Sequence, residues 1–332
     1  MNKQVKATLS RFMFAALGAA VISFGYSPAD AAYPEKPITL VVPVSAGGGM
    51  DAFARIVAKY SKKHIGQKMI VKNRPGAGGQ RAINELVKAE ADGYEIAAYT
   101  FTAEAFQPQL RPAGQTGYQR GDLIWVSTPS VVPSALFSRK GSDIKDLAAF
   151  IKKAKANPGK IILSQTGRLS VPAAFRMMIE KELNITTAGL NYKGGGKMFK
   201  AFLGKEVEIL NANIMFAKRA PDRLIPLAIA SSERHPIAPN APTFKELGFD
   251  IQDYLTRSIV VAKGTPQNII SHLDKGMQAM CKDSGFRADL KKAGLARTCW
   301  GLERTKKEQA TYIQQKVWII EEFKKKLKNS RI

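Results

Sequence analysis

The chain has 332 residues, of which 45% are hydrophobic and 23% are charged. This balance is typical of a folded globular protein, excludes a largely disordered chain, and leaves room for two domains. There are 51 lysine and arginine residues against 27 acidic residues, and the formal net charge of +24 favours an anionic partner. Two cysteines and three histidines are too few for a multi-cysteine zinc module or an iron–sulfur cluster, so no metal or cofactor is expected.

Residues 1–31 have the pattern of a secretory signal peptide. Three basic residues come first, and an apolar run over 12–25 follows that is too short to span a bilayer comfortably. The triplet Ala29-Asp30-Ala31 then forms an A-x-A cleavage site. We therefore expect residues 1–31 to be removed on export. The alternative interpretation is an N-terminal membrane anchor.

Strands and helices alternate in the rest of the chain. The apolar run 38–42 predicts a buried strand, a glycine loop follows, and helical spacing from Phe53 to Tyr60 predicts a helix that ends at Gly66. Further strands are expected at 69–71, 94–99, 131–137, 161–163, 189–192, 207–210 and 224–230, and further helices over 83–87, 143–156, 171–183, 198–203, 269–282, 286–292 and from about 306. This alternation predicts an α/β fold with parallel sheets. The elements fit two lobes, one formed by 32–136 with 229–332 and the other by 137–228.

Four glycine loops follow predicted strands, at 45–51, 74–79, 164–170 and 193–196. Ligands of open α/β sheets bind beyond the carboxyl ends of strands, so we expect these loops to line a cleft between the lobes. Backbone N–H groups beside a helix N-terminus suit an anion. The candidate ligand-binding residues are Ser45, Ala46, Gly47, Gly48, Asp51, Gly76, Ala77, Gly78, Gly79, Arg81, Thr166, Gly167, Arg168, Ser170, Tyr192, Gly194 and Arg257. Taken alone, each loop is equally compatible with a plain tight turn.

The loops do not have the motifs of nucleotide-binding proteins. Met50-Asp51 stands where a phosphate-binding loop needs Gly-Lys-Ser/Thr, and Arg81 replaces the last glycine of a dinucleotide fingerprint. No histidine adjoins a serine or cysteine in a nucleophile pattern, and G-x-S-x-G is absent. The sequence therefore predicts a binding protein and not an enzyme. The export signal and the lack of a basic run interleaved with aromatic residues argue against nucleic acid as the partner.

Two kinds of charged residue in the loops have alternative interpretations. Asp51 either hydrogen-bonds within the first loop or lies as an acid in the first helical turn, and we favour the first role because a carboxylate would repel an anionic ligand. Arg74, Arg81 and Arg168 either grip a carboxylate through the guanidinium fork or lie on the solvated surface, and we expect Arg257 where the chain returns between the lobes.

Several motifs occur in a characteristic order. The chain reads YPEKPI, VPVSAGGGMD, NRPGAGG and ADGY near its start, and NYKG, APTFKELG and AKGTP later. This series resembles the receptors of tripartite tricarboxylate transporters, also called Bug-type periplasmic solute-binding proteins, over nearly the whole chain after residue 32. The resemblance implies a monomeric two-lobed periplasmic binding protein of the Venus-flytrap (type II-like) kind. Such a receptor captures a di-, tri- or aromatic carboxylate or a related organic acid and delivers it to membrane permease subunits.

The resemblance also implies roles for particular loops. In this family the loops that match 45–51 and 76–79 hold one carboxylate, largely through backbone N–H groups and ordered water. The chain departs from the family pattern at Gln80-Arg81-Ala82, Arg168-Leu169, Gly195-Gly196-Lys197 and Leu255-Thr256-Arg257. These departures predict a distal pocket that is altered and more basic. The alternatives are an orphan receptor that feeds a sensor kinase and, in another class, an exported hydrolase.

Cys281 and Cys299 are the only cysteines in the chain. Because export leads to an oxidising compartment, we predict a disulfide between them; the alternative is two buried thiols. Cys281 falls near the end of a predicted helix and Cys299 in a predicted strand. The bridge would join the C-terminal helices to the first lobe, away from the ligand.

Overall fold

The computed structural model describes residues 33–110, 117–167, 170–295 and 298–329. The predicted signal peptide lies outside these ranges. The chain divides into two units between residues 35 and 36. Residues 33–35 contain no helix or strand, and every element named below belongs to the second unit.

Five strands form one part of the main sheet: β1 (Ile38–Val42), β2 (Met69–Asn73), β3 (Glu95–Tyr99), β9 (Tyr254–Ala262) and β4 (Leu123–Arg139). The first strand is buried because its run of apolar residues is covered on both faces, as in parallel sheets. It pairs in parallel with β2 and β3, whereas β9 is antiparallel to both β3 and β4. The sheet is thus mixed, and the prediction of purely parallel sheets is wrong.

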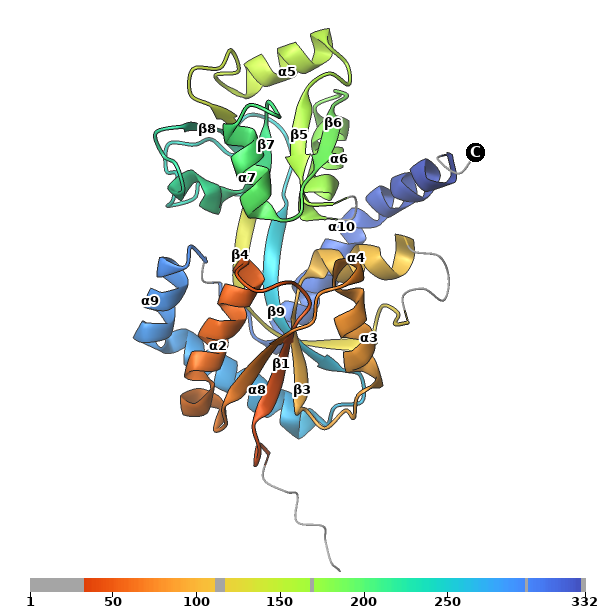
Figure 1. The fold of residues 1–332 in the computed structure, drawn as a ribbon, viewed down its shortest axis with the longest axis vertical. Coiled ribbons are helices and arrows are strands. Elements are labelled where there is room, and N and C mark those ends of the chain that lie inside the picture. Colours follow the sequence, from red (N-terminus) through yellow and green to blue (C-terminus); the bar gives the residue numbers. More distant parts are fainter. Residues whose placement is uncertain (1–32, 111–116, 168–169, 296–297, 330–332) are drawn as a thin grey trace, which may run out of the picture. The chain divides into compact units, whose positions relative to one another are not determined.

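The second half of β4 belongs to another group of strands. It pairs in antiparallel fashion with β7 (Leu210–Asn213) and β8 (Leu224–Ile229), and β5 (Ile162–Gln165) lies parallel to β6 (Ala188–Asn191). Figure 1 shows β4 running beside β9 and continuing to this second group. The seventh strand begins three residues later than predicted, at Leu210.

Nine α-helices accompany the strands in the described part of the chain: α2 (Gly49–Ile65), α3 (Gln80–Lys88), α4 (Phe101–Leu110), α5 (Leu147–Ala156), α6 (Val171–Glu182), α7 (Gly195–Leu203), α8 (Gln267–Lys282), α9 (Ser284–Lys292) and α10 (Leu302–Asn329). Two short 3₁₀ helices, η1 (Ala77–Gly79) and η2 (Ile214–Lys218), complete the set. Helix α5 begins later than predicted because Asp146 is its N-cap and accepts a hydrogen bond from the backbone N–H of Ala149.

Three segments of the chain that connect the two groups of strands are hydrogen-bonded to one another, around Ser134, Ala230 and Asp253. The backbone N–H of Ser134 donates to Asp253, that of Asp253 to Ala230, and that of Ala230 back to Ser134, which closes a ring of hydrogen bonds. The buried carboxylate of Asp253 also accepts a hydrogen bond from Ser134 Oγ at 2.6 Å. Lys316 of α10 forms a salt bridge with Asp253 at 3.2 Å, and both side chains are fully buried.

The last helix packs against helices that lie far apart in the sequence. Apolar residues of α4, α6 and α10, including Phe106, Met177 and Ile320, form one buried cluster. The Lys316 ammonium also contacts Met178 Sδ of α6 at 2.8 Å. Helix α10 therefore contacts elements of both predicted lobes.

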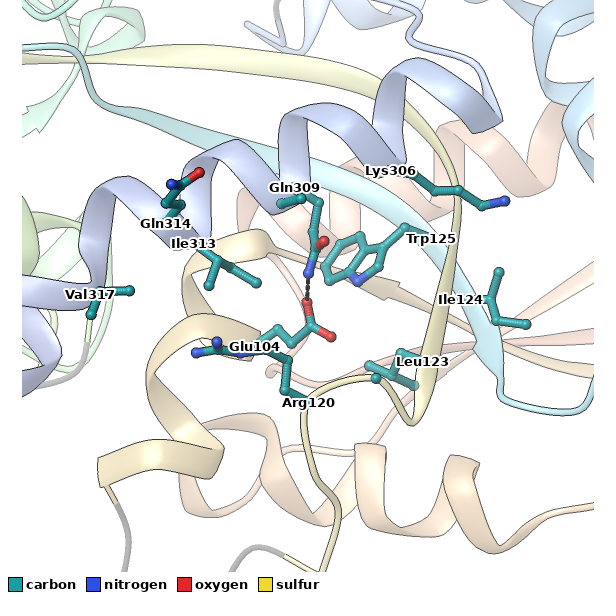
Figure 2. Close-up of a pocket in the computed structure, with 12 residues that line it drawn as sticks. Glu104, Arg120, Leu123, Ile124, Trp125, Lys306, Gln309, Ile313, Gln314 and Val317 are labelled. Atoms are coloured by element: carbon teal, nitrogen blue, oxygen red, sulfur yellow. Dashed lines mark hydrogen bonds between the residues drawn. The ribbon is translucent and has the colours of Figure 1, made fainter.

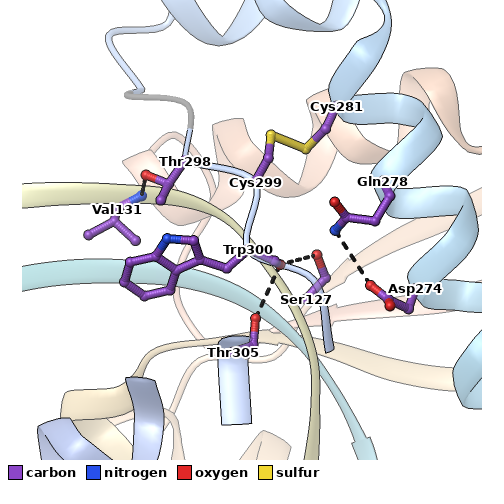
Figure 3. The surroundings of a disulfide bond; sticks show 9 residues. All are labelled: Ser127, Val131, Asp274, Gln278, Cys281, Thr298, Cys299, Trp300 and Thr305. Atoms are coloured by element: carbon purple, nitrogen blue, oxygen red, sulfur yellow. Dashed lines mark hydrogen bonds between the residues drawn. A yellow bond between two sulfur atoms is a disulfide. The ribbon is translucent and has the colours of Figure 1, made fainter. Parts of the chain in front are cut away.

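A disulfide joins Cys281 of α8 to Cys299, with 6.0 Å between the two Cα atoms, as the sequence predicts (Figure 3). Cys299 does not lie in a strand, because it has a positive φ of 57° and directly precedes an isolated bridge between Trp300 and Thr128 of β4. The Trp300 carbonyl accepts a hydrogen bond from Ser127 Oγ. The disulfide therefore connects α8 to the segment that pairs with the first half of β4.

Candidate functional site

The first glycine loop connects β1 to α2. Residues 44–49 are exposed, and Gly47 has a φ of 85°, a conformation that favours glycine. Helix α2 begins at Gly49 with Gly48 as its N-cap, and no side chain caps this end. A 17-residue helix thus presents its N-terminus, with the positive end of its dipole, directly behind an exposed glycine loop.

Asp51 fixes the shape of this loop. Its buried carboxylate accepts hydrogen bonds from the backbone N–H of Gly47 at 2.9 Å, from Arg55 Nε at 3.0 Å and from Asn73 Nδ2 at 2.9 Å. Burial alone would raise the pKa of Asp51, but these hydrogen bonds and the Arg55 charge together lower it below its ordinary value. The structural role that we favoured from the sequence is the one observed.

The second glycine loop packs against the first. Asn73, at the end of β2, donates to both Asp51 and the carbonyl of Val44. A Cβ on Gly79 would lie 2.9 Å from the Cβ of Pro43, so a side chain at this position would separate the loops. The two loops therefore form one connected surface, in which Gly76, Ala77, Gly78 and Gly79 lie beside the loop that carries Ser45, Ala46, Gly47 and Gly48.

The arginines of the second loop have acidic partners. Arg81 is exposed and lies 3.3 Å from Glu85, and Arg74 forms salt bridges with Glu85 and Glu95. Neither guanidinium is buried at the glycine surface. The part of Arg81 in ligand binding remains a prediction.

The third and fourth loops follow β5 and β6, and they also lie together. The backbone N–H of Tyr192 donates to the carbonyl of Gln165, the last residue of β5. Ser170 is the N-cap of α6: its Oγ accepts from Ala173 N–H and donates to the Gly167 carbonyl. The hydroxyl that we predicted as a ligand contact thus has a structural role already.

The remaining predicted residues of these loops have different surroundings. The half-buried Tyr192 places its hydroxyl 3.3 Å from Glu206, and burial together with this carboxylate raises its pKa. Gly194, with a φ of 97°, is the N-cap of α7, and Thr166 follows β5 directly. Arg168 lies outside the described residues. All four loops follow the carboxyl ends of strands as predicted, and a cleft between the two pairs stays a prediction.

Arg257 lies in β9, opposite Ser130 of β4. It is only 5% exposed, and its Nε and Nη1 atoms are buried without a hydrogen-bond partner. The buried hydroxyl of Ser130 also has none. Burial lowers the pKa of Arg257 to about 10. An arginine held in this way is costly, because a buried charge normally requires a partner.

Gly49 connects Arg257 to the first glycine loop. A Cβ on residue 49 would lie 2.9 Å from Arg257 Nη2 and 3.8 Å from Nε, so the guanidinium lies directly against the first residue of α2. Sequence reasoning did not select Gly49 or Ser130. The signal for Gly49 was the third glycine of the run Gly47-Gly48-Gly49, whereas the register of Ser130 with Arg257 leaves no trace in the sequence.

A separate cavity of about 560 Å³ lies between α4, β4 and α10 (Figure 2). Glu104 faces it and accepts a hydrogen bond from Gln309, and burial raises the pKa of Glu104 to about 7. None of the residues that line the cavity belongs to the glycine loops. The cavity is thus separate from the loops that the family resemblance assigns to the ligand, and we keep the glycine loops as the candidate site.

Within the described ranges, every helix is too short or too polar to cross a membrane.

The observed fold, two groups of α/β elements joined by long shared strands, is that of two-lobed solute-binding proteins. The chain matches the tripartite tricarboxylate transporter family receptor over residues 53–324 and belongs to that family. This confirms both the resemblance and the predicted fold class.

Individual relatives agree with this assignment. The chain is 29% identical to Protein BugT of Bordetella pertussis over 266 residues, which cover 77% of this chain and 81% of that protein. The structure of the periplasmic binding protein BugD matches with a TM-score of 0.72 at 25% identity, covering 89% of this chain and 98% of that one. The structure of MatC from Rhodopseudomonas palustris with bound malate matches with a TM-score of 0.74 at 25% identity, covering 88% and 99%.

Proposed function

We propose that this protein is a periplasmic receptor that captures a small organic carboxylate and delivers it to the membrane subunits of a tripartite transporter. Membership of the receptor family supports the proposal, and so does the malate bound by MatC. The proposal includes export directed by residues 1–31, and it includes no catalytic step.

The observation that carries the proposal is the pair of glycine loops locked together by Asp51 and Asn73. Because the carboxylate of Asp51 is used within the loop, the surface offers the backbone N–H groups at the start of α2 and not a negative charge. We assign the first carboxylate of the ligand to residues 45–49 and 76–79. The loops that contain Thr166, Gly167 and Gly194 would close over the rest of the ligand from the second lobe, formed by residues 137–228.

Thermal unfolding of the purified protein with acetate, malate, adipate, citrate and benzoate tests this function, followed by calorimetry on each acid that stabilises it. A ligand at 100 times its Kd should raise the free energy of unfolding by about 2.7 kcal/mol. If none of these acids shifts the unfolding transition, the proposed ligand class is wrong.

The Gly48→Val variant tests the position of the site. A Cβ on Gly48 would have only Ser45 O near it, at 4.0 Å, so the fold should tolerate the substitution while the side chain covers the backbone donors. We expect weaker carboxylate binding with little loss of stability without ligand. Unchanged affinity in this variant would place the ligand elsewhere.

A further inference from the structure

Arg257 is a buried cation at the positive end of a helix. Its guanidinium lies against Gly49, the first residue of α2, where the helix dipole concentrates positive charge. Within the described part of the chain, no acidic side chain forms a salt bridge with it, and Nε and Nη1 lack hydrogen-bond partners. Burial, an unsatisfied donor and a like-charged neighbour each destabilise this arrangement in the absence of an anion.

The absence of a side chain at residue 49 leaves space beside Nη2 of this buried guanidinium. Gly49 is exposed, and its φ does not lie in the left-handed region, so its backbone conformation does not require glycine. The reason for glycine here is space, because the edge formed by Arg257 Nη2 and Nε faces the position that a Cβ would fill.

We propose that Arg257, the N-terminal turn of α2 and Ser130 form a buried anchor for a carboxylate group, which selects the anionic end of the ligand. This inference rests on the proposed function and concerns the same site. The carboxylate lies over Gly49, accepts hydrogen bonds from the Arg257 guanidinium and from the first backbone N–H groups of α2, and supplies the missing counter-charge. Ser130 Oγ, across the strand pair from Arg257, is the additional polar group of the anchor.

The Arg257→Met variant separates this role from a structural one. An arginine that stabilises the fold loses stability when truncated, whereas an unpaired buried cation replaced by an apolar side chain leaves stability equal or raises it. We expect the variant without ligand to unfold at or above the wild-type temperature. Its affinity for malate or acetate should fall roughly 10- to 100-fold, because charge-assisted hydrogen bonds are lost.

Arg139 provides the matched control. It lies at the end of β4 and donates to the carbonyls of Phe202 and Val207, so its donors have partners within the protein. Arg139→Met should lower the unfolding temperature and leave carboxylate affinity unchanged. The Gly49→Ala variant is the second test: its methyl group must push the guanidinium aside, so affinity should fall while the helix remains intact.

The experiment combines thermal unfolding and calorimetry, at constant ionic strength, with NMR of the arginine Nε–Hε groups, in which the Arg257 signal is the one lost in Arg257→Met. A shift of that signal on addition of acetate or malate, together with lost affinity in both variants, supports the anchor. If malate binds wild type and Arg257→Met equally, the anchor is wrong and the receptor function stands. If acetate moves the Arg257 signal but malate, adipate and citrate do not bind, the anchor stands and the ligand is a monocarboxylate. If no carboxylate moves the signal, the anchor is overturned.

Discussion

Asp51 makes its three hydrogen bonds as an acceptor only, to Gly47, Arg55 and Asn73. In Asp51→Asn, an amide NH₂ group replaces one carboxylate oxygen, so a hydrogen-bond donor then faces at least one of these donors. We expect the free energy of unfolding to fall by about 1–3 kcal/mol and carboxylate affinity to fall with it, because the loops separate. Urea denaturation and calorimetry measure both effects.

The control for Asp51 is Asp143→Asn, which removes an exposed salt bridge with Lys153 and should change stability by less than about 1 kcal/mol. Because the pKa of Asp51 is lowered in the folded protein, its contribution is present above its unfolded pKa and is lost on acidification. The difference between wild type and Asp51→Asn should therefore shrink at low pH. A constant difference down to the acid transition would contradict this role.

Glu104 gives a pH dependence of the opposite sign. Burial raises its pKa from 4.5 to about 7, so between these values the folded protein holds a proton that the unfolded chain releases. Stability should therefore fall as pH rises through this window, by up to about 3 kcal/mol, and Glu104→Gln should remove that part of the pH dependence. Chemical denaturation at pH 5, 6, 7 and 8 tests this. Arg120 and Lys306 also line the cavity. Parallel profiles for the two proteins would show that Glu104 does not hold the proton.

What the sequence predicts about single residues depends on how local their partners are. The role of Asp51 was accessible because Gly47 lies four residues away, within the same loop. The surroundings of Arg257 were not, because they depend on a cross-strand register with Ser130 and on a helix start about 200 residues earlier. No periodicity in one sequence encodes such a contact.

At the scale of elements, the glycine loops and their strands were predictable because an apolar run that ends in glycine is a strong local signal. Of the long strand β4, only the second half was predicted, at 131–137; the first half was missed, and Pro129 near its middle argues against a continuous central strand. The register of β4 with β9 shifts between Ser127 and Ser130, which accommodates Pro129. Strand β9 was missed because Thr256, Arg257 and Ser258 interrupt its apolar pattern, and α4 was missed because Pro108 lies within it.

The disulfide joins one element, α8, to the segment that pairs with β4, across a sequence separation of 18 residues. Its loss should lower the free energy of unfolding by roughly 3 kcal/mol on the chain-entropy estimate. We expect reduction, or the Cys281→Ser/Cys299→Ser double variant, to lower Tm and leave carboxylate affinity unchanged. Reductant should have no further effect on the double variant. Two titratable thiols in the unfolded, unreduced wild-type protein would contradict the bridge.

At the scale of the whole molecule, the order of motifs was sufficient to predict the family and the fold class, and most of the motifs adjoin the start or end of a strand or helix. The segments that connect the two groups of strands were not predictable, because β4 and β9 form part of them and neither strand was predicted in full. We expect carboxylate binding to draw the two predicted lobes together by rotation about these segments.

Small-angle scattering of the purified protein measures this closure. The radius of gyration should decrease when malate, or another acid shown to bind, is saturating. The Gly48→Val variant at the same concentration is the control, since it should bind weakly and keep the profile of the protein without ligand. Identical profiles at demonstrated saturation would contradict closure.

The ring of backbone hydrogen bonds among Ser134, Ala230 and Asp253 has a mechanical consequence. When two lobes rotate about a pivot, atoms far from the pivot move further than atoms close to it. The ring can serve as such a pivot, because its hydrogen bonds join three segments of the chain and the buried salt bridge between Lys316 and Asp253 holds them together. We therefore expect rotation of the predicted lobes about this ring to move the glycine loops furthest, while the hydrogen bonds of the ring stay intact.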